Sequence, residues 1–141
     1  MYNNCNNDDI VPLAMRGVRA ETKTGNMSTD PGRMYYTGYL PNRIREAFGA
    51  LGHRISQTIY SYGTPIAVLI DGTWIIPDVT YSATTSSKHQ THLYQLGGEY
   101  IPWDCSAEEL ERVVNGLMRY RRGYNGKVGS WVPSPNWEPG C

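Results

Sequence analysis

The sequence predicts an α+β fold in which a small antiparallel β-sheet packs with two or three helices. Ile66–Ile70 is an apolar run without a polar face, which is typical of a strand covered on both sides. Asp71-Gly72 follows this run directly and fits a two-residue hairpin turn of type I′. Ser106 and Glu109 form a capping box before apolar residues at helical spacing. A chain of 141 residues has room for one hydrophobic core, so we expect a single domain.

The first part of the chain is polar. Asn, Asp, Thr and Gly dominate residues 1–35, and Asp30-Pro31-Gly32 is a turn signal. One short apolar patch, Ile10–Met15, can dock on the domain or on a partner. Because few apolar groups are present to offset the entropy of ordering, we expect residues 1–35 to form a flexible N-terminal arm and the domain to span residues 36–123.

The domain begins with a helix, because Pro41 suits a first turn and apolar residues then recur at helical spacing. The first elements are, in order, a helix at 41–52, a strand at 55–62, a bend at Gly63, the strand at 66–70, its returning partner at 73–76 and a short helix at 87–96 that ends at Gly97.

The final helix starts at the capping box and carries an apolar stripe. Its members are Leu110, Val113, Val114 and Leu117. We expect this helix to end at Gly123. Gly, Pro and Ser dominate residues 124–141, which predicts an irregular C-terminal tail with Trp131 and Trp137 able to tuck against the domain.

Composition restricts the class of protein. Thirteen basic and thirteen acidic residues cancel, which disfavours a globally basic nucleic-acid binder. The three cysteines are an odd number without metal or redox spacing, and the polar start of the chain is unlike an export signal, so we expect a reducing cytoplasm. No apolar stretch is long enough for a membrane span, and no glycine-rich phosphate loop is present, so we expect no membrane association and no cofactor.

The best candidate for a ligand site is the polar segment at the predicted start of the 87–96 helix. Thr84 and Thr85 lie beside unpaired helix N–H groups, and Lys88 and His89 follow one turn later. Such a cluster can bind the phosphate of a nucleotide or nucleic acid, with Tyr60 and Tyr62 as an aromatic wall. The alternative is an ordinary helix cap with an exposed lysine. These six residues are our predicted ligand-binding residues.

Two histidines, His89 and His92, share one face of this predicted helix. They could serve a metal, with Asp78 or His53 as the third ligand, although the sequence nominates neither clearly and we expect no metal site. A small hydrolase or nuclease that uses His89 with Thr84 or Thr85 is an alternative function. Packing or hydrogen bonding is the alternative role for both histidines.

Cations and tyrosines alternate near the expected end of the final helix. Such a pattern suits nucleic acid, because Arg contacts phosphate and Tyr stacks on bases. The alternative is that these cations complement the helix dipole. The predicted nucleic-acid-binding residues are Arg119, Tyr120, Arg121, Arg122, Tyr124 and Lys127.

Two segments resemble a known family when they are taken together. They are the stretch from Ser61 to Ala67 and the stretch from Tyr81 to Gln90. Their pairing resembles a family of small uncharacterised proteins encoded mainly by bacteriophages of actinobacteria, in which an S-Y-x-T-x-I-A strand precedes a segment with Tyr-Ser, Thr-Thr and His-Gln. The resemblance covers Tyr60–Leu96. That family has no assigned activity, so the resemblance implies an origin.

The sequence therefore favours a phage accessory protein without enzymatic activity. We expect it to bind a host protein, nucleic acid or nucleotide in the cytoplasm of the host bacterium. A minor structural component of the virion is a further alternative, because the polar N-terminal arm could contact neighbouring subunits. The sequence leaves the oligomeric state open.

Overall fold

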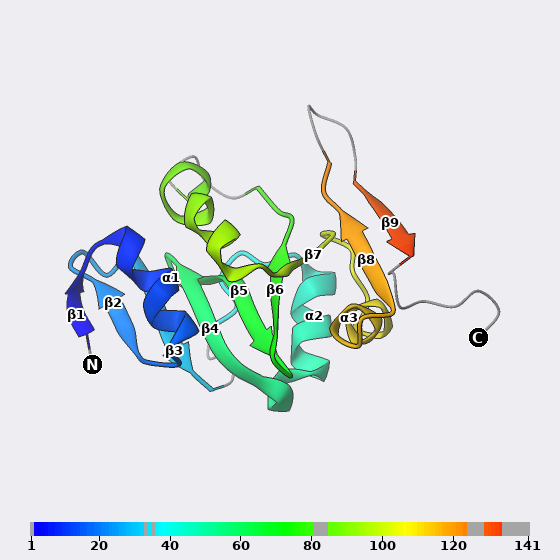
Figure 1. Cartoon of the computed structure of the whole chain (residues 1–141), viewed down its shortest axis with the longest axis horizontal. Coiled ribbons are helices and arrows are strands. Elements are labelled where there is room, and N and C mark those ends of the chain that lie inside the picture. The colour runs from blue at the N-terminus through cyan, green and yellow to red at the C-terminus, as the bar shows by residue number, and fades with distance from the viewer. Residues whose placement is uncertain (1, 33, 35, 81–84, 124–128, 134–141) are drawn as a thin grey trace.

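The computed structural model describes residues 2–32, 34, 36–80, 85–123 and 129–133 and has the predicted α+β fold. Over these residues nine strands form one open sheet, in which each strand pairs with the next strand along the chain (Figure 1). The pairs β1–β2 and β6–β7 are parallel, and the other pairs are antiparallel. The strands are β1 Tyr2–Cys5, β2 Ala20–Thr22, β3 Met27–Pro31, β4 Ile55–Ser61, β5 Thr64–Ile70, β6 Thr73–Pro77, β7 Glu99–Ile101, β8 Met118–Arg121 and β9 Ser130–Pro133.

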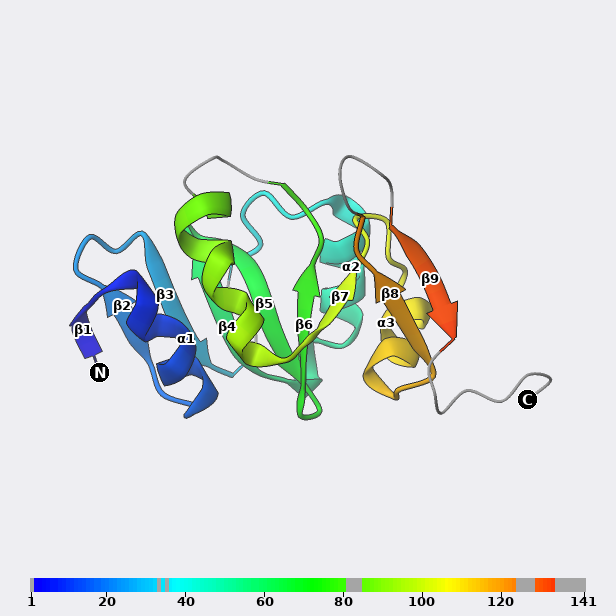
Figure 2. The same cartoon turned by 45° about the horizontal axis from the view of Figure 1, so that its top comes forward.

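Helices cover both faces of this sheet (Figure 2). One face packs against α2 and α3, and the other packs against α1 and the 3₁₀-helix η3. Trp74, Ile75 and Ile76 show the division, because Ile75 belongs to the first core and its two neighbours belong to the second. The helical elements are α1 Asn7–Met15, α2 Asn42–Ala50, the short turn η1 Gly52–Arg54, the π-turn η2 Thr85–His89, η3 Gln90–Leu96 and α3 Ala107–Val114.

The central strand β5 has the two-sided cover that its sequence predicts. Val68 and Ile70 are buried in the core beneath α2 and α3, whereas Ile66 and Ala67 are buried in the core beneath α1 and η3. The predicted Asp71-Gly72 turn is confirmed, with φ angles of 48° and 83° and Ile70 opposite Thr73. The predicted helix at 41–52 and the predicted strand at 55–62 correspond to α2 and β4.

The N-terminal segment differs from the loose arm that its composition predicts. Residues 2–31 form β1, α1, β2 and β3, and β3 pairs with β4 along its whole length. Ile10, Val11 and Ala14 of α1 are buried against the sheet. The segment has few apolar residues, but those of α1 lie on one face and meet an apolar surface that β4 and β5 already present. Composition alone therefore does not predict that α1 packs against the sheet.

The last helix also differs from the prediction, because α3 ends at Val114 and not at Gly123. Gly116 has a φ angle of 76°, its N–H donates to Val113 O at 3.1 Å, and the Leu117 N–H donates to Arg112 O at 2.8 Å. These two bonds form a Schellman motif, which Asn115-Gly116 permits. The chain then continues as β8.

The expected irregular tail contains strand structure as well. Within the described part of residues 124–141, β9 pairs with β8, and Trp131 packs partly buried against the core beneath α2 and α3. Trp137 lies outside the described residues. The predicted helix at 87–96 is present as the π-turn η2 followed by η3, and it ends at Gly97 with a left-handed φ angle of 61°.

Candidate functional site

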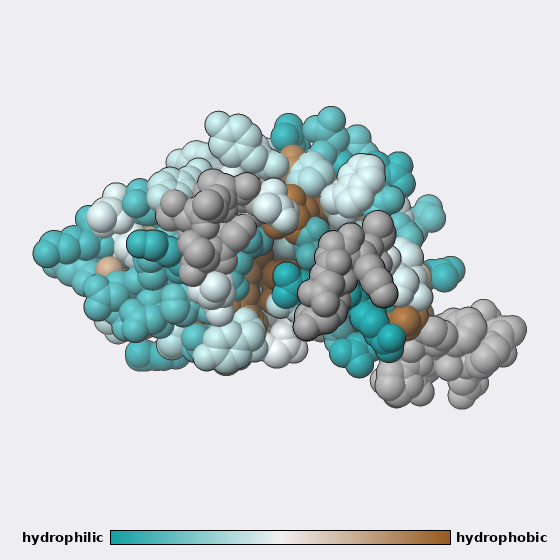
Figure 3. Space-filling view, turned by 90° about the horizontal axis from the view of Figure 1, so that it is seen from above, coloured by the Kyte–Doolittle hydropathy of each residue, from teal (hydrophilic) through white to brown (hydrophobic). Residues whose placement is uncertain are grey.

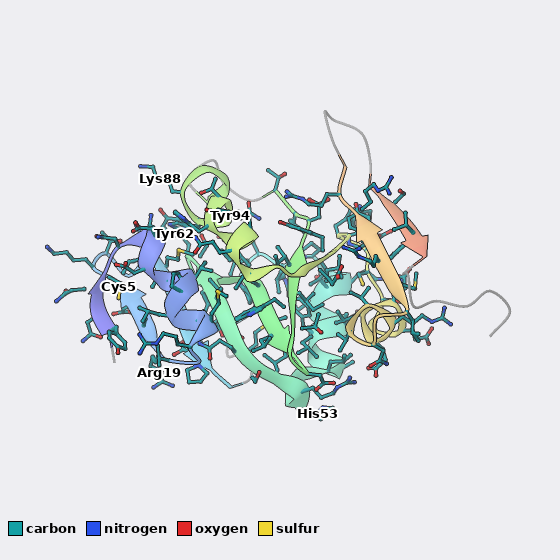
Figure 4. The ribbon with its side chains drawn as sticks, viewed as in Figure 1. Cys5, Arg19, His53, Tyr62, Lys88 and Tyr94 are labelled. Atoms are coloured by element: carbon teal, nitrogen blue, oxygen red, sulfur yellow. The ribbon has the colours of Figure 1, made fainter. Side chains whose placement is uncertain are left out.

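Four segments that are far apart in the sequence surround an open groove of about 640 Å³. They are the β1–α1 junction, the β2–β3 turn, the tip of the β4–β5 hairpin and η2. Cys5, Tyr62 and Lys88 mark this end of the molecule in Figure 4. The surface over the β1–β3 end is mainly hydrophilic, and hydrophobic surface lies nearer the middle of the molecule (Figure 3). The groove is lined by Cys5, Asn6, Asn7, Thr22, Lys23, Thr24, Asn26, Tyr62, Lys88 and His89.

Backbone hydrogen bonds hold three of these segments together. The Tyr62 N–H donates to Asn26 O at 2.8 Å, which ties the tip of the β4–β5 hairpin to the β2–β3 turn. The Lys23 N–H donates to Cys5 O at 3.2 Å and ties that turn to β1. The groove therefore depends on the packed N-terminal segment.

A buried cluster of two hydroxyls and one imidazole supports the groove at η2. Ser61 Oγ lies 2.6 Å from His89 Nδ1 and 2.8 Å from Thr85 Oγ1. The three side chains are 1–4% exposed. Burial, and secondarily the neighbouring His92, lowers the pKa of His89. The imidazole is therefore neutral at pH 7, and the cluster connects β4 to η2.

Tyr62 occupies an uncommon backbone position beside this cluster. Its φ angle is 49°, in the left-handed region that bulky residues rarely adopt. Its ring centroid lies 5.5 Å from that of His89, and the two planes are tilted by 35°. The residue is 49% exposed, so His89 covers only part of the ring.

The lining of the groove contains no carboxylate among the described residues. Lys23 and Lys88 are both exposed, and the other polar side chains of the lining are amides, hydroxyls, the Cys5 thiol and the His89 imidazole. The nearby carboxylate of Asp9 accepts a hydrogen bond from the Asn6 N–H at 2.9 Å and lines a separate pocket beside α1. The groove can therefore hold an anion through lysines and amide N–H groups.

The structure brings four of the six predicted ligand-site residues to one place. Tyr62, Lys88 and His89 line the groove, and Thr85 lies in the cluster behind it. Tyr60 is instead buried, with its ring packed edge-on against Tyr36 at 6.1 Å. Thr84 lies outside the described residues.

Sequence reasoning missed the other side of the groove. The amides and threonines of residues 5–7 and 22–26 lie in a segment that reads as loose, and no local pattern marks them. Ser61 was detectable, because it stands in the first segment of the family resemblance. Its partner in space, His89, stands in the second segment.

The histidine pair is not assembled into a metal centre. Figure 4 shows His53 at the lower edge of the view and Lys88 at the upper edge, with the sheet between them. Asp78 instead accepts a hydrogen bond from Tyr120 Oη at 3.4 Å and pairs with Arg122. Among the described residues, no three His, Cys, Asp or Glu side chains lie together as metal ligands.

The predicted basic cluster lies on and after strand β8, and acidic residues from other elements meet two of its cations. Arg119 pairs with Glu99 at 3.3 Å. Arg122 pairs with Asp78 at 3.4 Å and lies over the ring of Tyr100, 4.3 Å from its centroid. Arg121 is exposed, and the predicted Tyr124 and Lys127 lie outside the described residues. These carboxylates oppose the attraction of a phosphate backbone to this surface.

Comparison with known proteins identifies a family. None of the described helices has the length and apolar character needed to cross a membrane. No curated protein and no solved structure matches the chain. Residues 17–108 match the model of a family described as a family of unknown function, DUF8033, and this match includes the whole Tyr60–Leu96 stretch. Because the match covers more than half of the sequence, the chain belongs to DUF8033, an uncharacterised family.

Proposed function

We propose that this protein acts by binding a phosphate-bearing ligand, a nucleotide or a nucleic acid, in the groove between the N-terminal segment and η2. The observation that carries the proposal is the charge of the lining. Lys23 comes from the β2–β3 turn and Lys88 from η2, and no carboxylate lies among the described lining residues. In a chain with equal numbers of acidic and basic residues, such a surface favours anions.

The same surface supports binding over catalysis. Ser61 and His89 have the separation of a nucleophile and its base, which is the observation that favours a hydrolase as the second candidate. Both side chains are almost fully buried, however, and His89 Nδ1 contacts a hydroxyl that is also hydrogen-bonded to Thr85. A hydrogen-bonded core cluster of this kind holds η2, which carries Lys88, against β4.

The biological setting is part of the proposal. The paired segments around Ser61 and His89 resemble a bacteriophage family, which supports a phage accessory protein in the cytoplasm of a host bacterium. A small protein can act there by binding a target molecule, without catalysing a reaction. A host protein as the partner, or a place in the virion, would be a different function and is an alternative outcome of the test.

A binding titration with inorganic triphosphate, ATP and a short oligothymidylate tests the proposal. We expect Lys23→Gln/Lys88→Gln to weaken binding by about tenfold or more, since a hydrogen bond to a charged group contributes roughly 1.5–3 kcal/mol. Raising the salt concentration is expected to weaken wild-type binding. The matched control is Arg16→Gln/Arg43→Gln, which removes the same charge from exposed positions outside the lining of the groove.

Two results would contradict the proposal. One is the absence of binding by any of the three ligands at low salt. The other is an equal loss of affinity in the groove variant and the control, which would indicate a response to net charge alone. The recovered ligand separates binding from catalysis. Intact ligand supports a binding protein, and cleaved ligand whose cleavage stops in Ser61→Ala supports the hydrolase.

A further inference from the structure

We infer that Tyr62 is a stacking platform for a planar base, so that the groove recognises the nucleotide unit and not phosphate alone. This inference rests on the proposed function, because it assigns the second half of the same ligand. The argument begins with the backbone of the β4–β5 turn, where Tyr62 and Gly63 have φ angles of 49° and 77°. A type I′ turn requires positive φ at both positions and favours Asn, Asp or Gly at the first.

A tyrosine at the first position is unfavourable for the turn itself. Bulky side chains are rare at positive φ, and where they persist the surrounding structure holds them, often at functional sites. The other two-residue hairpin of this sheet has Asp71 at the equivalent position, with a φ angle of 48°. The conformationally favourable Asp71 thus occurs in the turn away from the groove, and the unfavourable Tyr62 occurs in the turn that lines it.

The Tyr62 ring is held in place but is only partly covered. His89 lies against it, with 5.5 Å between the centroids, and the hydrogen bond between Ser61 Oγ and His89 Nδ1 fixes the imidazole. The Tyr62 N–H is bonded to Asn26 O, so the backbone beneath the ring is fixed too. Yet half of the residue remains exposed. A fixed, half-covered ring offers its free surface to a ligand at little entropic cost.

The two lysines complete the recognition of a nucleotide. Lys23 and Lys88 border the groove that Tyr62 also lines, so a ligand can place a base on the ring and its phosphate between the cations. Stacking on tyrosine accepts every base, because each base has a π-face. A free nucleotide and a unit of a single strand share this chemistry, and the choice of ligand distinguishes them.

The test compares ATP, a short oligothymidylate and inorganic triphosphate on wild type, Tyr62→Gly, Tyr62→Asn and Tyr62→Phe. Wild type is expected to bind ATP or the oligonucleotide more tightly than triphosphate. Tyr62→Gly and Tyr62→Asn suit the turn but lack the ring, so they are expected to lose about tenfold in affinity for base-containing ligands and to bind triphosphate unchanged. Tyr62→Phe keeps a stacking ring and is expected to keep the affinity.

Thermal unfolding of all four proteins accompanies the titration, so that a loss of folding is recognised. A preference for ATP supports a free nucleotide, and a preference for the oligonucleotide supports a strand. Equal wild-type affinity for triphosphate and for both base-containing ligands overturns the inference, as does full binding of the preferred base-containing ligand by folded Tyr62→Gly. Either result leaves the lysine effect intact, so it is distinct from failure of the proposed function, in which triphosphate does not bind either.

Discussion

The two hairpin turns that flank β5 have the same length and nearly the same backbone but opposite kinds of support. At one end Asp71-Gly72 joins β5 to β6, and at the other Tyr62-Gly63 joins β4 to β5. Asp at positive φ is favoured by the local chain, because its short side chain tolerates that conformation. Tyr is not. The first turn is therefore specified by its own residues, and the second depends on what packs around it.

The contacts around the two turns differ in the same way: those of Asp71 lie near the surface, and those of Tyr62 reach the core. Asp71 accepts a hydrogen bond from Arg54 Nε at 2.6 Å, and Arg54 also pairs with Glu111 of α3, with side chains that are 44% (Asp71), 42% (Glu111) and 23% (Arg54) exposed. Surface ion pairs of this kind stabilise a protein little. Tyr62 instead lies against His89, which is buried and hydrogen-bonded to Ser61. The turn at the groove is thus coupled to the core, which suits a turn that presents a side chain to a ligand.

The largest expected difference between the turns comes from removing the support of each. His89→Ala takes away a buried ring, its contact with Tyr62 and the partner of Ser61, so we expect a loss of about 2–4 kcal/mol in the free energy of unfolding. Arg54→Met removes the ion pairs of Arg54 with Asp71 and Glu111 and is expected to cost clearly less. Urea denaturation of both variants measures this, and an equal or larger loss in Arg54→Met would contradict the comparison.

The two turns should also respond to acid in different pH ranges. Burial lowers the pKa of His89, so the unfolded chain binds a proton more readily than the folded chain. Stability is therefore complete above about pH 6.5 and falls as the pH drops below that value, by at most about 1.4 kcal/mol per pH unit, until the folded pKa is passed. The hydrogen bond from Arg54 lowers the pKa of Glu111, so that carboxylate loses its contribution only in more acidic solution, as the pH falls through its folded pKa.

Denaturation between pH 7 and pH 5 measures the histidine effect. In His89→Gln the decline over this range is expected to become shallower than in wild type. An unchanged slope in His89→Gln would show that another group titrates there.

The smallest effect is expected from exchanging the residues of the turns themselves. Tyr62→Asp relieves the strained backbone but loses the ring contact, so stability is expected to change by less than about 1 kcal/mol. Asp71→Tyr introduces the strain without a histidine beneath the ring, and we expect a loss of about 1 kcal/mol. Asp71→Asn is the control, because it removes the charge but keeps a residue that tolerates positive φ. Equal losses in Asp71→Tyr and Asp71→Asn, measured by thermal unfolding, would assign the effect to the charge and not to the backbone.

The sequence predicted the elements whose signals are local. The apolar run of β5, the Asp71-Gly72 turn, the helix at 42–50 and the capping box of Ser106 and Glu109 each depend on neighbouring residues, and each is present in the structure. Errors arose where a nearby stop signal was passed over, as at Asn115-Gly116, and where weak strands such as β8 and β9 are stabilised mainly by each other.

The candidate site was predictable only in part, for a similar reason. The segment from Thr85 to His89 stood out as a polar cluster, and Lys88 and His89 do line the groove. Its other wall comes from residues 5–7 and 22–26, whose composition reads as a flexible arm. Their position follows from the pairing of β3 with β4 and from the burial of Ile10 and Val11, which are long-range contacts.

The sequence by itself determined the α+β class, the central hairpin and its Asp71-Gly72 turn, because propensity, periodicity and turn chemistry act over a few residues. The tertiary structure alone decided that the N-terminal segment joins the sheet, that acidic residues of other segments pair with Arg119 and Arg122, and that Tyr62 can occupy a left-handed position. Each of these outcomes depends on a partner far away in the chain. Burial of a shared surface, which a local pattern does not record, supplies the free energy for all of them.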